Sequence, residues 1–276
     1  MKILITGGNG NIAKMIRNNL NSISYEIINL SRTDLNVLDQ FAIERYLKEN
    51  NFDILVHTAI LGGRRTKEET GEVTHLNLLM LENLLKFADR FKMIINFDSA
   101  AIYDRSTDIL ERKEEDLHTI PTDYYGFSKY VIYQRSLSYI NMYNFRIFNI
   151  FHTNEEADRF IKSCFLAEKN NTDITIYEDK YFDFMHEDDF IKIIKYYFDN
   201  LDNQKVLEKT INICYNKKYR LSDIAKLILN HHDKIKIIKE NSDKNYSGND
   251  NKLSKLNIEF AGLEKSIHMY KEKLFL

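Results

Sequence analysis

The chain contains 276 residues, of which 39 are basic and 41 acidic, giving a formal net charge of −2 at pH 7. With 43% hydrophobic residues, a chain of this length can bury a large core, either as one α/β domain or as two lobes. Because the charges nearly balance and the basic residues are dispersed, neither nucleic acid nor a membrane is expected as a partner.

The N-terminal apolar run and the cysteines bear on the cellular compartment. Ile3-Leu4-Ile5 is only a strand's length and leads straight into glycines, so it is neither a signal peptide nor a membrane span. Cys164 and Cys214 lie far apart and outside any CxxC spacing, so neither a disulfide framework nor a metal site is expected. These features predict a reduced, soluble, cytoplasmic protein.

Segments of strand and helix character alternate through the first half of the chain. Short apolar runs predict strands over residues 2–6, 25–30, 54–57, 93–97 and 145–150. Helical periodicity predicts helices over residues 12–20, 40–50, 76–91 and 124–141. Strands separated by helices of this length imply βαβ crossovers, and hence an α/β fold with a Rossmann-type, doubly wound parallel sheet.

The second half has a different texture, with charged helices and short strands predicted over residues 174–177 and 210–213. Residues 234–239 are the densest local group of lysines and indicate a solvated face. We therefore expect two domains. The first is a nucleotide-binding domain over residues 1–152, with a segment returning at about 182–205. The second is a smaller α/β lobe that binds substrate and takes up most of 153–276.

A glycine-rich loop follows the first predicted strand and precedes the first predicted helix. In this context G-x-x-G-x-x-A predicts a dinucleotide site: Gly7 permits a tight turn, Gly10 lets the backbone approach a pyrophosphate, and Ala13 allows close helix–strand contact. The helix N-terminus supplies amide donors and a favourable dipole. The predicted cofactor-binding residues of this loop are Gly7, Asn9, Gly10, Asn11 and Ile12.

The end of the second predicted strand bears on the choice between NAD and NADP. Sites that prefer NAD usually place an acidic residue there, whereas here Arg32 follows the strand and suits a 2′-phosphate by charge and planar geometry. Asp34 is the competing candidate, and Arg32 would then be a solvated surface residue. The sequence favours NADP(H) as cofactor.

Tyr125 and Lys129 lie four residues apart and therefore share one face of a predicted helix. There the ammonium of Lys129 would lower the pKa of the Tyr125 phenol and make it a proton donor near neutral pH. The pair alone occurs by chance in many chains. Together with the glycine loop and with Ser99 at the end of an earlier strand, it predicts a hydride-transfer site.

Taken together, these residues resemble the extended short-chain dehydrogenase/reductase family, whose members are nucleotide-sugar epimerases, dehydratases and reductases. The resemblance extends over nearly the whole chain. Besides the motifs above, it rests on the segments His57-Thr58-Ala59, Asn77, Ser99 to Tyr103, Arg146-Ile147-Phe148-Asn149 and Asp183-Phe184-Met185-His186. Within the family the GDP-fucose synthase branch is the most similar, through Ser31 to Asp39 and Gly62-Gly63.

The resemblance implies further contacts, and it implies a homodimer. Beyond the glycine loop, the implied cofactor contacts are Ser31, Arg32, Asn36, Val37, Thr58, Ala59, Tyr125, Lys129 and Phe148. The implied substrate is a nucleotide-diphosphate sugar, with contacts from Ser99, Ala100, Asn149, Lys180 and Phe182. Phe182 stands where the family has an arginine, and Lys180 is the nearby cation that would take over its phosphate contact.

Departures from the family pattern narrow the expected chemistry. Dehydrating members carry an Asp-Glu pair after the catalytic serine or threonine, and the GDP-fucose synthase branch carries a cysteine there and a histidine farther on. This chain has Ala100 and Ala101 instead, and residues 154–158 contain no histidine. Alanine exchanges no protons, so neither dehydration nor 3,5-epimerisation has its acid or base. Three nearby acids are the open substitutes, namely Glu155, Glu156 and Asp158.

The residues that are present predict NADPH-dependent reduction of the C4 ketone of a 4-keto nucleotide sugar. Tyr125 would protonate the C4 oxygen, Ser99 would hydrogen-bond it, and Lys129 would bind the nicotinamide ribose. A nucleotide-sugar 4-epimerase with tightly bound NAD would use the same three residues. A non-catalytic NADP-binding regulator is the third possibility, although such proteins tend to lose the tyrosine or the lysine.

Overall fold

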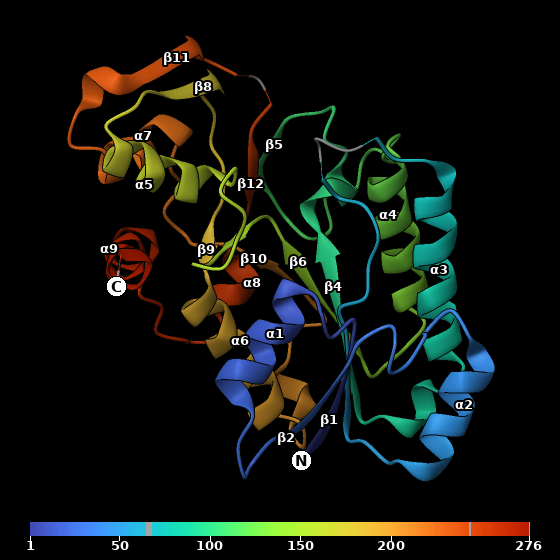
Figure 1. The fold of residues 1–276 in the computed structure, drawn as a ribbon. Coiled ribbons are helices and arrows are strands. Elements are labelled where there is room, and N and C mark those ends of the chain that lie inside the picture. Colours follow the sequence, from blue (N-terminus) through green and yellow to red (C-terminus); the bar gives the residue numbers. More distant parts are fainter. Residues whose placement is uncertain (65–67, 243, 276) are drawn as a thin grey trace. The chain divides into compact units, whose positions relative to one another are not determined.

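The computed structural model describes residues 1–64, 68–242 and 244–275 (Figure 1). By its internal contacts the chain divides into two compact units. Unit 1 comprises residues 1–104, 117–146 and 193–211, and unit 2 comprises residues 105–116, 147–192 and 212–276.

Unit 1 is built around a six-stranded sheet of order β10-β6-β4-β3-β1-β2. The strands are β1 (Lys2–Thr6), β2 (Glu26–Leu30), β3 (Ile54–His57), β4 (Met93–Ser99), β6 (Met142–Ile147) and β10 (Thr210–Ile213). The helices are α1 (Asn11–Leu20), α2 (Gln40–Glu49), α3 (Gly71–Leu85), α4 (Tyr124–Ser136) and the second half of α6 (Glu187–Asp199), with short 3₁₀ turns η1 (Ala88–Arg90), η2 (Ala100–Tyr103) and η3 (Gln204–Val206). β1 runs parallel to β2 and β3, and β3 runs parallel to β4. The predicted Rossmann-type fold is confirmed.

The central strands β1, β3, β4 and β6 are buried at nearly every position because helices cover both faces of the sheet. Figure 1 shows α2, α3 and α4 on one side and α1 on the other. Leu4, Leu55 and Ile94, from β1, β3 and β4, are fully buried in one apolar cluster with residues of these three helices. This core fixes the strand ends, and hence the loops that follow them.

Unit 2 contains smaller sheets of two strands each, paired as β11 with β8, β12 with β5 and β7 with β9. Its strands are β5 (Ile109–Arg112), β7 (Ile150–Phe151), β8 (Ile174–Glu178), β9 (Met185–His186), β11 (Ile235–Lys239) and β12 (Tyr246–Gly248). Its helices are α5 (Phe160–Asn170), α7 (Leu221–Ile228), α8 (Asn251–Ser254), α9 (Leu263–Phe275) and the first half of α6, with the 3₁₀ turn η4 (His232–Lys234). Aromatic rings fill its core, and Phe165 stacks on Tyr270 with ring centroids 5.2 Å apart.

Several element boundaries differ from those that the sequence predicts. α3 begins at Gly71 and ends at Leu85, and α4 ends at Ser136, where two turns lead into the next strand. β6 begins at Met142 and ends at Ile147, three residues earlier than the predicted segment at both ends. The lysine-rich segment at 234–239 contains strand β11.

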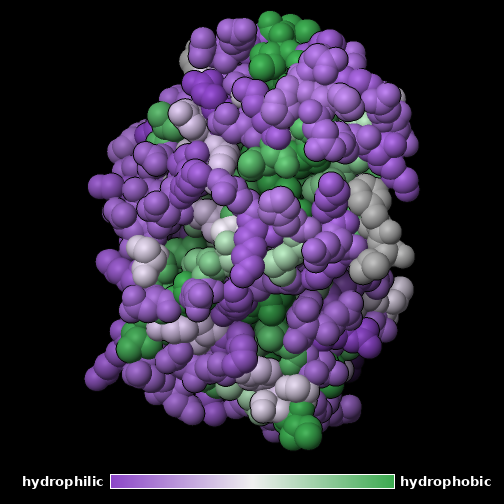
Figure 2. Space-filling model, turned by 90° about the vertical axis from the view of Figure 1, so that its left-hand side faces the viewer, coloured by the Kyte–Doolittle hydropathy of each residue, from purple (hydrophilic) through white to green (hydrophobic). Residues whose placement is uncertain are grey.

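Figure 2 shows one face of the molecule, which is mostly hydrophilic and carries hydrophobic residues in separate patches. Among the described residues, no helix combines the length and apolarity needed to cross a membrane. The described part of the chain also contains no cluster of three or more metal-ligating side chains.

Candidate active site

The glycine loop is held against the end of β3 by a contact that only glycine permits. Gly7 has φ +74°, and a Cβ there would lie 2.6 Å from the Ala59 nitrogen and 2.9 Å from Thr58 Oγ1. The Gly10 N–H donates to the Gly7 carbonyl at 2.8 Å, which closes the turn before α1. The predicted contacts Gly7, Gly10, Thr58 and Ala59 thus lie together.

Helix α1 begins at Asn11 with Gly10 as its N-cap residue, and no side chain caps it. The first N–H groups of a helix have no intrahelical acceptor. Asn11 is exposed and Ile12 is half-buried at this end. Uncapped amides at the end of a glycine turn form a surface suited to a phosphate group.

The same loop also lies against the end of β2. The Gly8 N–H donates to the Leu30 carbonyl at 2.8 Å, and Asn29 Nδ2 donates to the Gly8 carbonyl at 3.0 Å. A Cβ at Gly8 would lie 2.8 Å from Asn29 Oδ1. Gly8 and Asn29 were not among the predicted site residues, although the paired glycines at 7 and 8 signal a close backbone approach.

Asp34 and Arg32, the two candidates for reading the adenosine ribose, differ in their local contacts. Asp34 Oδ2 accepts hydrogen bonds from the Ser31 N–H at 2.9 Å and from the Ser31 hydroxyl at 2.6 Å. These bonds lower the pKa of Asp34. Arg32 is exposed at the tip of the same turn. One carboxylate oxygen of Asp34 is therefore committed to the turn, whereas the Arg32 side chain is exposed to solvent.

The two predicted adenine contacts lie just after this turn. Asn36 is half-buried, and its Oδ1 accepts the Leu38 N–H at 3.2 Å. The Val37 side chain belongs to the core cluster of unit 1. A ligand would therefore meet Val37 through its backbone.

Tyr125 and Lys129 lie on one face of α4, as their spacing predicts. Lys129 Nζ is 5.7 Å from the centroid of the Tyr125 ring and donates to the Phe97 carbonyl at 2.6 Å. The ammonium is buried, and this burial lowers the pKa of Lys129 to about 8, while the charge of Asp98 acts in the opposite direction. Lys129 is therefore still largely protonated near pH 7 and lies beside the phenol ring.

The start of α4 is fixed against the segment that follows β4. Asp123 caps the helix, and its Oδ1 accepts the Gly126 N–H at 2.8 Å. A Cβ at Gly126 would lie 2.8 Å from the Ala101 carbonyl oxygen. The absent side chain brings the Tyr125 end of the helix into contact with η2, which begins directly after Ser99.

Ser99 is positioned by a buried charged network behind the end of β4. Its Oγ accepts the Ala101 N–H at 3.2 Å, and its own N–H donates to Asp98 Oδ1 at 2.8 Å. The other Asp98 oxygen pairs with Arg146 Nε at 2.8 Å, and Arg146 also donates to the Tyr103 hydroxyl. Ala100 and Ala101, the departures from the family pattern, are buried within η2.

The predicted contacts of unit 2 fall into two groups. Phe148 and Phe182 both pack on the Tyr246 ring, at centroid distances of 5.4 and 5.0 Å. Asn149 Oδ1 accepts from Arg159 at 2.9 Å, and Lys180 Nζ lies 3.4 Å from Glu178 Oε2. The two aromatic residues thus share one cluster, whereas the two polar ones interact with other side chains.

The three acids that could replace an epimerase base lie in different environments. Glu156 and Asp158 are exposed. Glu155 is buried, and its Oε1 accepts a 3.4 Å hydrogen bond from the Tyr270 hydroxyl of α9. Burial raises the pKa of Glu155 to about 7. The Glu155 carboxyl group is therefore buried within unit 2 and hydrogen-bonded to Tyr270.

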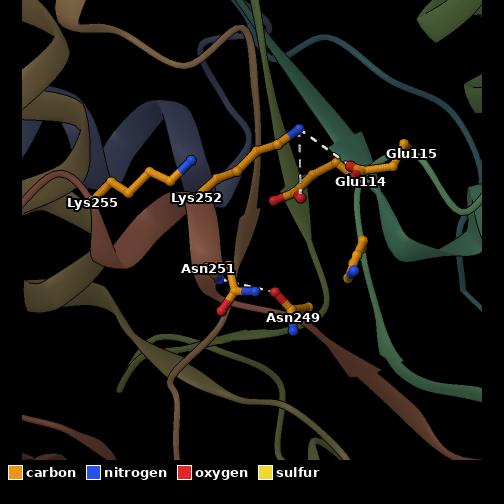
Figure 3. A pocket seen from close by; sticks show the side chains of 7 residues that line it. Glu114, Glu115, Asn249, Asn251, Lys252 and Lys255 are labelled. Atoms are coloured by element: carbon orange, nitrogen blue, oxygen red, sulfur yellow. Dashed lines mark hydrogen bonds and ion pairs between the residues drawn. The ribbon is translucent and has the colours of Figure 1, made fainter.

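Unit 2 also contains a polar cavity of about 440 Å³ (Figure 3). Figure 3 shows Lys252 reaching toward two glutamates, and its Nζ lies 3.3 Å from Glu115 Oε2 and 3.8 Å from Glu114 Oε2. The lining residues are Lys113, Glu114, Glu115, Asn249, Asn251, Lys252 and Lys255. None of these is a predicted site residue, and the Lys252 charge is already matched by carboxylates.

The sequence is similar to those of known proteins. The model of the NAD dependent epimerase/dehydratase family matches residues 3–214. GDP-L-colitose synthase of Yersinia pseudotuberculosis is 31% identical over 112 residues, which are 39% of this chain and only 36% of that relative's length.

Solved structures with similar folds include three nucleotide-sugar enzymes. GDP-mannoheptose C4 reductase from Campylobacter jejuni, with NADP bound, has a TM-score of 0.81 and 19% identity, covering 98% of this chain and 97% of that one. A dTDP-4-dehydrorhamnose reductase from Clostridium acetobutylicum has a TM-score of 0.82 and 17% identity, covering 100% of both chains. A GDP-L-fucose synthetase from Naegleria fowleri, bound to NADP, has a TM-score of 0.78 and 18% identity, covering 99% and 92%. At these identities the likeness is one of fold.

Proposed function

The chain belongs to the NAD dependent epimerase/dehydratase family, and we propose that it is an enzyme that reduces the C4 ketone of a 4-keto nucleotide sugar with NADPH. The observation that carries this proposal is the placement of Lys129 Nζ 5.7 Å from the Tyr125 ring, on a helix that contacts the segment after Ser99. The GDP-mannoheptose C4 reductase of the same fold, solved with NADP bound, adds support.

The residues of the glycine loop fit a dinucleotide. Gly7 closes the turn directly against the Ala59 backbone, where a Cβ would collide, and the uncapped N-terminus of α1 after this turn supplies amide donors for a pyrophosphate. Gly7, Gly10 and Asn11 would hold the phosphates, and Arg32 the 2′-phosphate. When bound, NADPH supplies the hydride.

Three side chains would carry the proton chemistry. Tyr125 donates its phenolic proton to the C4 oxygen of the substrate, and Ser99 donates a hydrogen bond to the same oxygen. The charge of Lys129, beside the Tyr125 ring, favours the ionised phenol that remains. Burial of Lys129 keeps water from screening that charge.

We further infer that unit 2 binds the nucleotide diphosphate, with Asn149 and Lys180 as polar contacts, and that the chain forms a homodimer. Half-buried Leu76 and Leu79 on α3 offer apolar surface for a second copy. Light scattering should then give twice the 32.8 kDa of one chain, and a monomer at working concentration would exclude the dimer.

Replacing Arg32 with alanine should weaken NADPH binding far more than NADH binding, by roughly 1.5–3 kcal/mol, because a charged hydrogen bond to the 2′-phosphate is lost. The measurement is fluorescence titration with both cofactors. Arg17→Ala, an exposed arginine on α1, is the matched control. Equal losses for both cofactors would make Asp34 the better candidate for contacting the ribose.

The function itself is tested by offering 4-keto GDP-, CDP-, UDP- and dTDP-sugars with NADPH and following the reduced cofactor. In D₂O the product should carry no enzyme-dependent deuterium at C3 or C5, because removal of a proton beside a ketone needs a base within hydrogen-bond reach. Alanines at 100 and 101 offer none, and Glu155 is engaged with Tyr270.

Two outcomes would contradict this reading. Enzyme-dependent deuterium at C3 or C5 would assign the epimerase role to another residue, and Glu155→Gln would then identify or exclude Glu155. A purified chain that retains stoichiometric NAD and interconverts C4 epimers would favour the 4-epimerase alternative.

A further inference from the structure

Glu69 joins two parts of unit 1 that meet at Tyr125. It lies half-buried just before α3. Its Oε1 accepts the Gly63 N–H at 2.6 Å, and its Oε2 accepts the Tyr125 N–H at 3.2 Å. One carboxylate therefore ties the loop after β3 to the first turn of α4.

The Tyr125 N–H needs such an acceptor. Tyr125 is the second residue of α4, and an amide in that position has no intrahelical partner. Asp123 already accepts the Gly126 N–H. A carboxylate beside the N-terminus of a helix is also favoured by the helix dipole.

The loop that Glu69 holds packs directly on the phenol end of Tyr125. A Cβ at Gly63 would lie 2.9 Å from Tyr125 Cζ, the carbon that bears the hydroxyl, and 3.1 and 3.3 Å from the two neighbouring ring carbons. Gly63 has φ +91°. The close approach and the backbone conformation both require glycine at this position.

The start of the loop is fixed independently of Glu69. Asn77 of α3 accepts the Leu61 N–H at 2.9 Å and donates to the Leu61 carbonyl at 3.0 Å. At Gly62, with φ +79°, a Cβ would lie 2.8 Å from Glu69 Oε1. The Gly62-Gly63 pair thus passes between Glu69 and the Tyr125 ring with no room for side chains.

We propose that Glu69 is a positioning residue for Tyr125: it presses the Gly63 backbone against the ring and thereby fixes the direction of the phenol hydroxyl. This inference rests on the proposed function, in which that hydroxyl donates the proton. Glu69 itself does not touch the reacting atoms. Proton transfer requires close alignment of donor and acceptor, so a looser ring costs turnover more than binding.

The test compares Glu69→Ala and Glu69→Gln with Glu72→Gln, an exposed glutamate in the first turn of α3. Glutamine keeps the shape but can accept only one of the two N–H groups in this geometry. We expect Glu69→Ala to lower kcat roughly 10- to 100-fold, with a smaller loss for Glu69→Gln. The Kd for NADPH should change less than about twofold, and Glu72→Gln should match the wild type.

A second arm separates positioning from a general structural role. In a Tyr125→Phe background, Glu69→Gln should cause no further loss of kcat, because the hydroxyl that it positions is gone. A loss of the same size in both backgrounds, or an unchanged kcat in the wild-type background, would overturn the proposal.

A third arm does not depend on activity. Hydrogen exchange at Gly63 and Tyr125 should be faster in either Glu69 variant than in the wild type, and unchanged exchange would overturn the inference whether or not any substrate is found. A wild-type chain that reduces no 4-keto nucleotide sugar would instead refute the proposed function. If Glu69→Ala fails to fold, Glu69→Gln decides the question alone.

Discussion

Replacing Tyr125 with phenylalanine should lower turnover by roughly 10²–10⁴-fold, the usual contribution of a positioned general acid. The ring would still pack against Gly63 and beside Lys129, so NADPH binding should change little. The measurement is kcat at saturating substrate, together with the Kd for NADPH.

Tyr124→Phe is the matched control for this variant. Tyr124 is the preceding residue of the same helix, its side chain is exposed, and its main-chain carbonyl, not its phenol, accepts the hydrogen bond from Thr74. It should retain wild-type turnover. Wild-type turnover in Tyr125→Phe itself, with an isotope effect showing that hydride transfer limits the rate, would remove Tyr125 from the mechanism.

Replacing Gly7 with alanine should destabilise the chain by about 3 kcal/mol, from a strained left-handed backbone plus overlap with neighbouring main chain. The added Cβ would lie 2.6 Å from the Ala59 nitrogen and 2.7 Å from its Cα, and neither atom can move without displacing the end of β3. NADPH binding should be lost with the loop geometry. Chemical unfolding and cofactor titration measure the two effects.

Gly71→Ala provides the comparison for Gly7→Ala. Gly71 begins α3, and a Cβ there would meet only Tyr124 Cε1, at an ordinary 3.7 Å. The free energy of unfolding of Gly71→Ala should differ from that of the wild type by less than about 1 kcal/mol. Unfolding of Gly7→Ala at the same denaturant concentration as Gly71→Ala would show that the glycine loop does not lie as close to the end of β3 as described.

The sequence predicts correctly those strands whose bounds are marked by their own residues. The bounds of β1 and β3 match the predictions because apolar runs there end at a glycine loop or at polar residues. The predicted segment 145–150 begins three residues after β6 does, because the polar residue Asn144 interrupts the apolar pattern near the start of the strand. That asparagine is buried and hydrogen-bonded to Asn96 and Ser136, both at 2.9 Å, and Asn96 lies 48 residues away, so the partners that allow its burial are outside the strand.

The sequence does not predict strands β5, β11 and β12, each of which pairs with a strand distant in the chain. β5 and β12 are short, and each exists as a strand because the other lies beside it, more than 130 residues away. The lysines near β11 indicate a solvated face, and Lys236 and Lys239 do occupy exposed positions, but the strand itself is set by pairing with β8. No window of neighbouring residues contains that information.

The candidate site likewise combines features within one helix, which the sequence predicts, with contacts between distant segments, which it does not. The spacing of Tyr125 and Lys129 is a property of one helix, so it could be predicted. The bond from Tyr125 to Glu69 crosses 56 residues of chain, and the contact with Gly63 depends on how a loop folds back. The one signal for this contact in the sequence is the glycine pair at 62 and 63, because adjacent glycines are typical of a backbone that closely approaches another group.

The interleaving of the two units has a consequence for how the protein can be made. Unit 1 is completed only by residues 193–211, and β10 pairs with β6 at one edge of its sheet. A nascent chain emerging from the ribosome therefore carries an unfinished sheet until most of its length has been synthesised. A shortened gene ending near residue 152 would expose β6 as a bare edge, whose free N–H and C=O groups invite aggregation. Unit 1 is thus not a separable module, and cutting the gene once should yield insoluble fragments on expression.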